Sequence, residues 1–326
     1  MRRRAFVALL GGALASPMIW PLVARAQQAV KVPQVVFFSP FATDDVRVQS
    51  FRQGLSDLGH VDGKDISVEY VVTPPDGVLR LAADIAARRP SAIVAATTPF
   101  ALAVKRATKS IPIVAVGVAD PVGTGLADSL ARSGQNVISL GNLGADMTGK
   151  RLELLKDVVP GLARVAMLVN PDDPASLVQL VQARAVAPIL GLDLRPVQAR
   201  PADDLGRLVE ATASGGVQAL AVTQAFAFLN DRERIAALSI KHRLPGIFAS
   251  REEVVAGGLL AYGADVRRVY RRAPHLLEKI LKGASPADMP VEQPAVFELH
   301  VNVRTAKAIG LSVPEAVVLR ATEVIE

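Results

Sequence analysis

The chain contains no cysteine among its 326 residues. Without a thiol it can form no disulfide, no thiolate zinc site, no cysteine nucleophile and no lipid-modified N-terminal cysteine. Hydrophobic residues make up 50% of the chain and charged residues 21%, which is too apolar a composition for a disordered protein. We therefore expect a globular protein of about two domains, with a core large enough to be stable without metals or crosslinks.

Long apolar runs and enzyme motifs are missing as well. No stretch after Ala26 reaches the roughly 18 uncharged apolar residues that a membrane-spanning helix needs. The Gly-x-Ser-x-Gly, phosphate-loop and His-Glu-x-x-His motifs are absent. Gly123-Thr124-Gly125 does not continue into a dinucleotide-binding pattern. We expect a protein without catalytic residues, cofactor or metal.

The four histidines, at positions 60, 242, 275 and 300, are too widely spaced to form a metal-ligand motif. We expect each of them to be a surface or helix-end residue rather than a metal ligand or a general base.

Acidic residues are absent from the first 26 positions, which contain four arginines. A basic start, an apolar stretch at 5–15 and the small-x-small sequence Ala24-Arg25-Ala26 predict a signal peptide over 1–26 that is cleaved after Ala26. Arg3-Arg4 suits the twin-arginine route and the Sec route equally, so both stay open. We expect a periplasmic protein.

The charge of the chain after the leader is nearly balanced. Removing the four leader charges from the formal net charge of +6 leaves about +2. Because a nucleic-acid-binding protein usually presents a strong basic patch, this balance predicts no nucleic-acid partner.

After Gln28 short β-branched runs alternate with amphipathic segments, a pattern typical of βαβ units and parallel sheets. Strands are expected over 32–39, 65–72, 91–97 and 111–117, and in a second series over 163–170, 192–199, 217–223 and 245–250. The fold class predicted is α/β, with two Rossmann-like lobes. The segment 257–311 is too short for a third domain and is expected to pass back between the lobes.

Ligands of open parallel sheets bind at the carboxyl ends of the strands, where this sequence places small hydroxyls, amides, carboxylates and aromatic rings. The predicted ligand-binding residues are Ser39, Phe41, Thr97, Thr98, Asp120, Asn142, Asn170, Thr223, Gln224, Phe226 and Tyr262. Such groups can hydrogen-bond the polar ends of a small molecule while rings cover its apolar body. Any single polar member can equally be a helix cap or a turn former.

Thr97-Thr98-Pro99 is the most informative of these segments. A proline in the first helical turn after two hydroxyls leaves backbone N–H groups and side-chain oxygens free for a carboxylate. Asp120-Pro121 offers a carboxylate suited to an ammonium group, or simply starts a turn. Together the two segments suit an amino acid.

The sequence resembles the ABC transporter substrate-binding family that includes the tryptophan and tyrosine uptake proteins, a branch of the type I periplasmic binding fold. The resemblance covers essentially the whole chain and is carried by FRQGLSDLGHVDGKDISVEY, IVAATTPFALAVKRATKSIPIV, DPVGTGLADSLARSGQNV, KRLELLKDVVPGLARVAMLVNP, AGGLLAYG and ILKGASPADMPVEQPAVFELHVNVRTAKAIGLSVP.

This resemblance implies two α/β lobes with parallel sheets, joined by a hinge of three crossovers. The first lobe is expected to comprise 30–142 and about 250–292, and the second 143–249 and about 293–326. A ligand is expected to be held between the lobes and delivered to an ABC permease in the inner membrane.

The resemblance also distributes the candidate residues. Ser39, Thr97-Thr98 and Asp120 match first-lobe cleft loops, Asn142 lies at the first crossover, Asn170 and Thr223-Gln224 match second-lobe loops, and Tyr262 lies near a later crossover. Relatives often carry Asp-Pro near Ala225-Phe226. This chain lacks that carboxylate, which removes one expected partner for a ligand ammonium group on the second lobe.

The predicted function is a monomeric periplasmic receptor that closes by a hinge around a small molecule, with an amino acid or an aromatic acid as the candidate ligand. A periplasmic sensor module that passes its ligand signal to a membrane receptor is the alternative, and the sequence does not separate the two. A DNA-binding regulator would need a helix-turn-helix before the first strand, where this chain has its leader.

Overall fold

The computed structural model describes residues 32–142, 147–200 and 203–326, and Val32–Glu326 form one compact unit. The leader lies outside the described residues, so the signal peptide, its cleavage after Ala26 and the export route stay predictions. Among the residues that the structure describes, no helix has both the length and the apolar character that a bilayer crossing requires.

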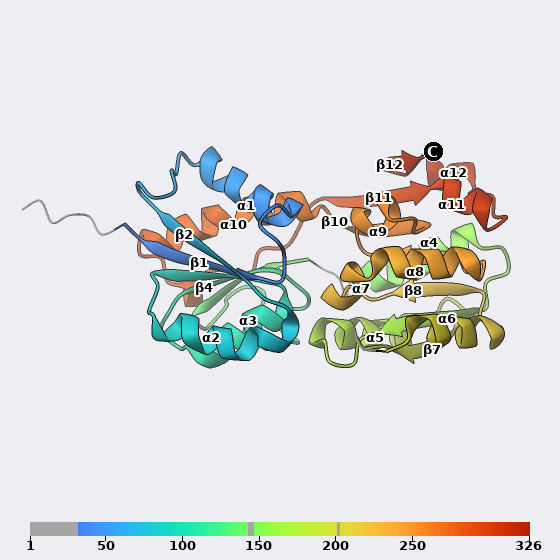
Figure 1. Ribbon diagram of the computed structural model, residues 1–326, viewed down its shortest axis with the longest axis horizontal. Helices are drawn as coiled ribbons and strands as arrows, with labels where there is room; N and C mark the ends of the chain where they lie inside the picture. The colour runs from blue at the N-terminus through green and yellow to red at the C-terminus, as the bar shows by residue number, and fades with distance from the viewer. Residues whose placement is uncertain (1–31, 143–146, 201–202) are drawn as a thin grey trace, which may run out of the picture. The chain divides into compact units, whose positions relative to one another are not determined.

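The first lobe is built on a sheet of five parallel strands in the order β2-β1-β3-β4-β5 (Figure 1). The strands are β1 (Gln34–Ser39), β2 (Ser67–Val72), β3 (Ala92–Ala96), β4 (Ile113–Val118) and β5 (Val137–Gly141). The helices packed on this sheet are α1 (Val46–Asp57), α2 (Val78–Ala87), α3 (Thr98–Ala107) and α10 (Val266–Leu281), with a short 3₁₀ turn η1 (Pro75–Gly77) before α2. A second 3₁₀ turn, η2 (Pro286–Asp288), follows α10.

Alternation along β1 divides the core of this lobe into two layers. Val35 and Phe37 pack with α1 and α10, whereas Val36 and Phe38 pack with α2 and α3. Successive side chains of a strand point to opposite faces, so a strand covered on both faces must be apolar throughout. β3 is buried at all five of its positions for the same reason.

The second lobe contains a seven-stranded sheet in the order β12-β11-β10-β9-β8-β6-β7. Its strands are β6 (Arg164–Val169), β7 (Asp193–Gln198), β8 (Ala219–Val222), β9 (Gly246–Phe248), β10 (Leu260–Ala264), β11 (Phe297–Asn302) and β12 (Glu323–Ile325). Every neighbouring pair is parallel except β10 and β11, which are antiparallel. The predicted α/β class with two lobes is confirmed, and the one antiparallel pair was not expected.

The helices of the second lobe form two layers. α4 (Met147–Val158), α5 (Pro174–Val186), α11 (Val303–Ala308) and α12 (Glu315–Val318) contribute to one core cluster. α6 (Leu205–Ser214), α7 (Phe226–Asn230), α8 (Arg232–Lys241) and α9 (Arg251–Val255) contribute to the other.

The chain passes between the lobes three times: after β5, at Asp265, and between η2 and β11. The predicted second passage near residue 250 is corrected by the structure, because β10 pairs with both β9 and β11 and therefore belongs to the second sheet. Asp265 directly follows β10 and accepts hydrogen bonds from the backbone N–H groups of Arg267 and Arg268. It thereby caps α10 and turns the chain back into the first lobe.

α1 and α10 cross at Gly54. A Cβ atom at Gly54 would lie 2.3 Å from the carbonyl oxygen of Arg271 and 3.0 Å from Cγ of Pro274. The oxygen belongs to the backbone of α10 and cannot rotate away, so only glycine permits the two helices to approach this closely.

We expect Gly54→Ala to destabilise the protein by about 1–3 kcal/mol, since the added methyl must push α10 away from the sheet. Gly149→Ala in α4 is the matched control: its Cβ would lie 3.4 Å from a Val186 methyl, an ordinary contact, and alanine favours the helix. Urea unfolding of both variants measures the difference. Equal stability of the two would contradict the tight crossing.

Candidate functional site

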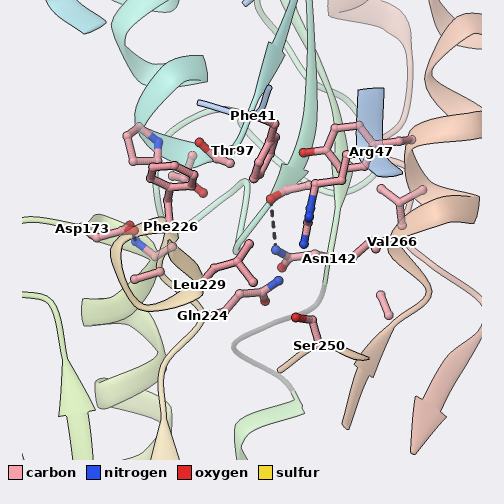
Figure 2. Close-up of a pocket in the computed structure, with 18 of the residues that line it drawn as sticks. Phe41, Arg47, Thr97, Asn142, Asp173, Gln224, Phe226, Leu229, Ser250 and Val266 are labelled. Carbon is pink, nitrogen blue, oxygen red and sulfur yellow. Dashed lines mark hydrogen bonds between the residues drawn. The ribbon is translucent and has the colours of Figure 1, made fainter. Parts of the chain in front are cut away.

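A pocket of about 70 Å³ lies between the two lobes, at the carboxyl ends of their strands (Figure 2). Six of the predicted site residues are in its wall: Phe41, Thr97, Thr98, Asn142, Gln224 and Phe226. Its other lining residues include Arg47, Pro99, Gly117, Asp173, Leu229, Ser250, Glu253, Val266, Val269 and Tyr270. The pocket thus draws on both lobes and on the passage at Asp265.

Thr97 has an unusual backbone conformation at the edge of the pocket. Its φ of 72° lies in the left-handed region, which a β-branched residue rarely adopts. Thr97 is the N-cap of α3, yet its side chain makes no capping hydrogen bond, and its Oγ1 atom is buried without a partner. Strain of this kind is retained at sites where function requires it.

Hydrogen bonds between neighbouring loops shape the first-lobe side of the pocket. Oγ1 of Thr98 accepts a hydrogen bond from the N–H of Ala119 at 3.0 Å, and Nδ2 of Asn142 donates to the carbonyl of Gly117 at 3.0 Å. Gly117 has a φ of +67°, and a Cβ there would lie 3.1 Å from the hydroxyl oxygen of Tyr270. Glycine at this position therefore leaves room for the Tyr270 ring.

Aromatic rings from both lobes meet across the pocket. Phe41 follows β1 and Phe226 begins α7 in the second lobe; their ring centroids are 5.7 Å apart in an edge-on arrangement. Tyr270 of α10 lies edge-on to Phe41 at 6.3 Å. Such arrangements are favourable and leave ring faces for an apolar ligand group.

Arg47 in the first turn of α1 is a site residue that the sequence analysis missed. It is 5% exposed, and its guanidinium lies over the Phe41 ring at 4.6 Å from the centroid. Its terminal nitrogens are 3.3 Å from Asp45 and 3.4 Å from Glu252. Glu252 belongs to α9, so this ion pair joins the two lobes.

Each charge of the Arg47–Glu252 pair favours the ionised form of the other group. Burial alone would lower the pKa of Arg47, but the carboxylates of Glu252 and Asp45 raise it above its usual value. Burial would likewise raise the pKa of Glu252, but the charge of Arg47 lowers it below its usual value. Both groups therefore stay charged at neutral pH although water is largely excluded from Arg47.

Asp173 is the second missed residue, and it provides a carboxylate on the second-lobe side of the pocket. It caps α5, accepting a hydrogen bond from the N–H of Ala175 at 2.9 Å, and is 7% exposed. Burial raises the pKa of Asp173 to about 6. The sequence did carry a signal, because aspartate followed by proline is a typical N-cap with proline at the first helical position. In this loop, however, only Asn170 was predicted.

Five predicted residues lie outside the wall of this pocket, and their part in ligand binding stays a prediction. Ser39 bonds to the backbone of Phe41, Asp120 caps a turn at Gly123, Asn170 accepts from the N–H of Asp172, Thr223 donates to the carbonyl of Leu168, and Tyr262 stacks on Phe297. Their side chains are engaged in ordering the loops that follow the strands, which is the alternative role that small polar residues have at these positions.

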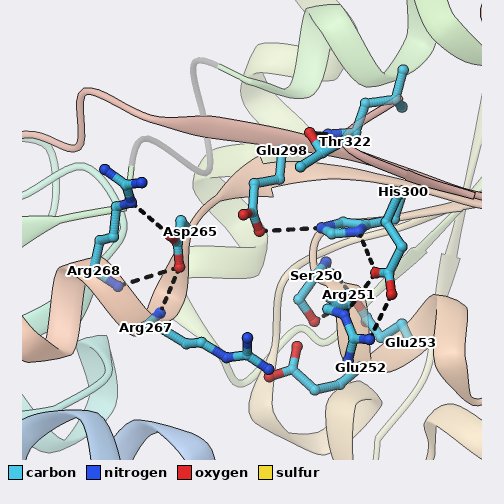
Figure 3. A network of polar contacts seen from close by, with 12 residues as sticks. Ser250, Arg251, Glu252, Glu253, Asp265, Arg267, Arg268, Glu298, His300 and Thr322 are labelled. Atoms are coloured by element: carbon cyan, nitrogen blue, oxygen red, sulfur yellow. Dashed lines mark hydrogen bonds and ion pairs between the residues drawn. The ribbon is translucent and has the colours of Figure 1, made fainter. Parts of the chain in front are cut away.

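A polar cavity of about 510 Å³ lies at the passage at Asp265 and shares Ser250, Ala264 and Val266 with the wall of the first pocket. Figure 3 shows the polar contacts around it. His300 of β11 is 4% exposed there; its ring nitrogens lie 3.2 Å from Glu298 and 3.1 Å from Glu323. Arg251 binds Glu323 at 2.7 and 2.6 Å, and this contact lowers the pKa of Glu323. The expectation of a surface or helix-end histidine is wrong for His300, because β11 is an inner strand of the sheet and the ring lies between Glu298 and Glu323.

Several known proteins share this fold over most of their length. A conserved domain protein from Vibrio cholerae superposes with a TM-score of 0.85 at 25% identity, covering 90% of this chain and all of that one. A Streptococcus pneumonia ABC domain in complex with L-Trp superposes with a TM-score of 0.84 at 21% identity, over 90% of this chain and 99% of that one. A Clostridioides difficile protein named tyrosine-binding protein is 25% identical over 270 residues, 82% of this chain and 77% of that protein.

The family comparison covers nearly all of the chain that the structure describes. Residues 31–325 match the family described as ABC transporter substrate binding protein. The two-lobed fold and the pocket between the lobes agree with that match, and the resemblance recognised in the sequence is confirmed. The chain belongs to the ABC transporter substrate-binding protein family.

Proposed function

We propose that this protein is a monomeric periplasmic receptor that closes its lobes around an α-amino acid with an apolar side chain and delivers it to an ABC permease. The observation that carries the ligand class is a pair of opposed polar groups in the pocket wall. Thr97 offers an unpartnered hydroxyl at a helix N-terminus on one lobe, and Asp173 offers a buried carboxylate on the other. The proposed activity involves no chemical step and no cofactor.

The first-lobe group suits the ligand carboxylate. The first backbone N–H groups of a helix have no partner within the helix, and the helix dipole favours an anion at this end. In α3 the Thr97 side chain makes no capping hydrogen bond. Pro99 has no N–H group, so it cannot donate to the Thr97 hydroxyl. The Thr97 hydroxyl and the first turn of α3 can therefore both donate to a carboxylate.

The second-lobe group suits the ligand ammonium. Burial raises the pKa of Asp173, and no cation among the residues that the structure describes offsets this effect. An ammonium group bound beside Asp173 would supply that compensation. This carboxylate comes from the loop before α5. It would supply the second-lobe carboxylate that the resemblance leads one to expect near Ala225-Phe226.

The apolar part of the wall suits the first carbon atoms of an apolar side chain. Phe41, Phe226, Leu229 and Tyr270 supply most of it. The relatives named for tyrosine and found with L-Trp bind amino acids of this kind, which supports the same class here.

Closure of the lobes would be stabilised from both sides of the pocket. A ligand that contacts Thr97 and Asp173 together binds only when the lobes are close, and the Arg47–Glu252 pair adds a contact in that state. Shifting a protein from 1% to 99% closed requires about 5.5 kcal/mol of differential binding. Contacts to one lobe alone cannot supply a differential of this kind.

The direct test is a ligand screen on the chain from Gln27 onward, denatured and refolded to remove any bound ligand. A ligand at a hundredfold excess over its Kd should raise the stability by about 2.7 kcal/mol, a clear thermal shift. The only tryptophan is Trp20 in the leader, so indole fluorescence reports the ligand alone. Thermal shifts with sugars or peptides, and none with amino acids, would contradict the proposal.

Asp173→Asn should abolish amino-acid binding without unfolding the protein. The wild type should bind about tenfold more weakly at pH 5 than at pH 8, because the carboxylate that faces the ammonium is protonated below its pKa of about 6. Titration calorimetry across this pH range measures both effects.

The same variant should be more stable than the wild type when no ligand is present. The folded-state pKa of Asp173 is raised, so this group's contribution to stability is complete at low pH and is lost as the pH rises through about 6. Asparagine retains the cap and carries no charge, so we expect a gain of about 1–3 kcal/mol at pH 8. Asp204→Asn is the matched control: it caps α6, lies outside the pocket and should change neither binding nor its pH dependence.

Glu252→Gln should speed ligand release about tenfold while leaving the association rate unchanged, because it removes a contact made between the closed lobes. Stopped-flow measurements of binding and release separate the two rates. Glu298→Gln, which has no contact with Arg47, serves as the control. An unchanged release rate for Glu252→Gln would show that the pair does not stabilise the closed form.

A further inference from the structure

A second cavity of about 500 Å³ adjoins the binding pocket. The two share four wall residues, which are Thr97, Pro99, Asp173 and Phe226. Figure 2 shows Thr97, Asp173 and Phe226 gathered at one side of the binding pocket. We call the second space the outer cavity; its remaining lining comes from η1, α2, α3, the loop before α5, and α7.

The binding pocket is too small for a whole large amino acid. Its roughly 70 Å³ can hold about five water molecules, since a cavity needs about 10–15 Å³ for each water. That space suits the amino, α-carbon and carboxylate atoms of a ligand. A large side chain must lie elsewhere, and the outer cavity is about seven times larger and begins at the residues proposed to bind the head group.

The outer cavity has a predominantly apolar lining with charged groups. The apolar part is supplied by Val78, Leu79, Leu102 and Pro174, together with Phe100, Ala103 and the ring of Phe226. Leu79 is 60% exposed and belongs to none of the core clusters, so its side chain is not needed for core packing. Asp76, Arg106 and Asp172 contribute charges to the same lining.

We infer that the outer cavity is the side-chain subsite of the receptor and that Leu79 is a specificity-determining residue within it. The ligand head lies between Thr97 and Asp173, and its side chain passes Phe226 to lie against α2 and α3. The cavity thus selects amino acids with long apolar or aromatic side chains over short or charged ones. This inference rests on the proposed amino-acid function.

Leu79→Asp tests the subsite by placing a carboxylate in it. Norleucine and lysine are ligands that differ only in the terminal ammonium group of lysine, and alanine is a ligand that fills only the binding pocket. Calorimetry on the chain from Gln27 should show that the wild type prefers norleucine to lysine. In Leu79→Asp the ratio of the two affinities should shift toward lysine by at least tenfold, and tyrosine should bind at least tenfold more weakly. Alanine affinity, measured by competition, should change less than twofold.

Leu130→Asp is the matched control, because Leu130 is also an exposed leucine of the first lobe, at 49%, and lies outside both cavities. It should leave every affinity unchanged. If Leu79→Asp weakens alanine and tyrosine equally, or leaves the norleucine-to-lysine ratio unchanged, the side chain does not occupy the outer cavity and the inference is wrong. If the wild type binds none of these amino acids, the proposed amino-acid function is wrong, and the side-chain subsite that rests on it is wrong as well.

Discussion

Each lobe has its own pair of hydrophobic cores, and little apolar surface is shared between them. The proposed closure of the lobes depends on this separation. The clusters on either side of the first sheet contain first-lobe residues, with α7 as an exception, since Phe226 and Leu229 pack against the cluster of α1 and α10. The second lobe is organised in the same way around its own sheet. Contact between the lobes therefore rests on a few rings, on the approach of α3 to α5 and on the Arg47–Glu252 pair. Interfaces of this kind are compatible with the proposed opening and closing.

The pocket contains polar groups whose hydrogen-bonding or charge requirements the protein itself does not meet. The Thr97 hydroxyl has no partner, the Thr97 backbone is strained, and the Asp173 carboxylate is desolvated without a cation. Each of these lowers the stability of the unliganded protein. A ligand of the proposed chemistry would satisfy these groups, so the proposed binding and closure would be driven by groups that are unfavourable in the unliganded protein.

Much of the architecture follows from local sequence, while some of the site does not. Apolar runs such as those of β1 and β3 predicted parallel strands because both faces of such a strand are buried, and Thr97 and Phe226 were found because they follow strands. Arg47 could not be found in this way: its importance comes from Glu252, about 200 positions later in the sequence. The passage at Asp265 was missed for a similar reason, since only the pairing of β10 with β9 shows to which sheet it belongs.

The return of α10 to the first lobe also determines the order in which the molecule can fold. α1 packs against α10 through Gly54 and Arg271, and the core of the first lobe includes Tyr270, Leu276 and Leu277. As the chain emerges from the ribosome, its first 142 residues lack the helix that covers one face of their sheet until nearly all of the second lobe has been synthesised. Contacts of such long sequence separation form late. The N-terminal lobe therefore cannot be completed before α10 has been synthesised, and a nascent chain interrupted before α10 would keep an apolar sheet face exposed.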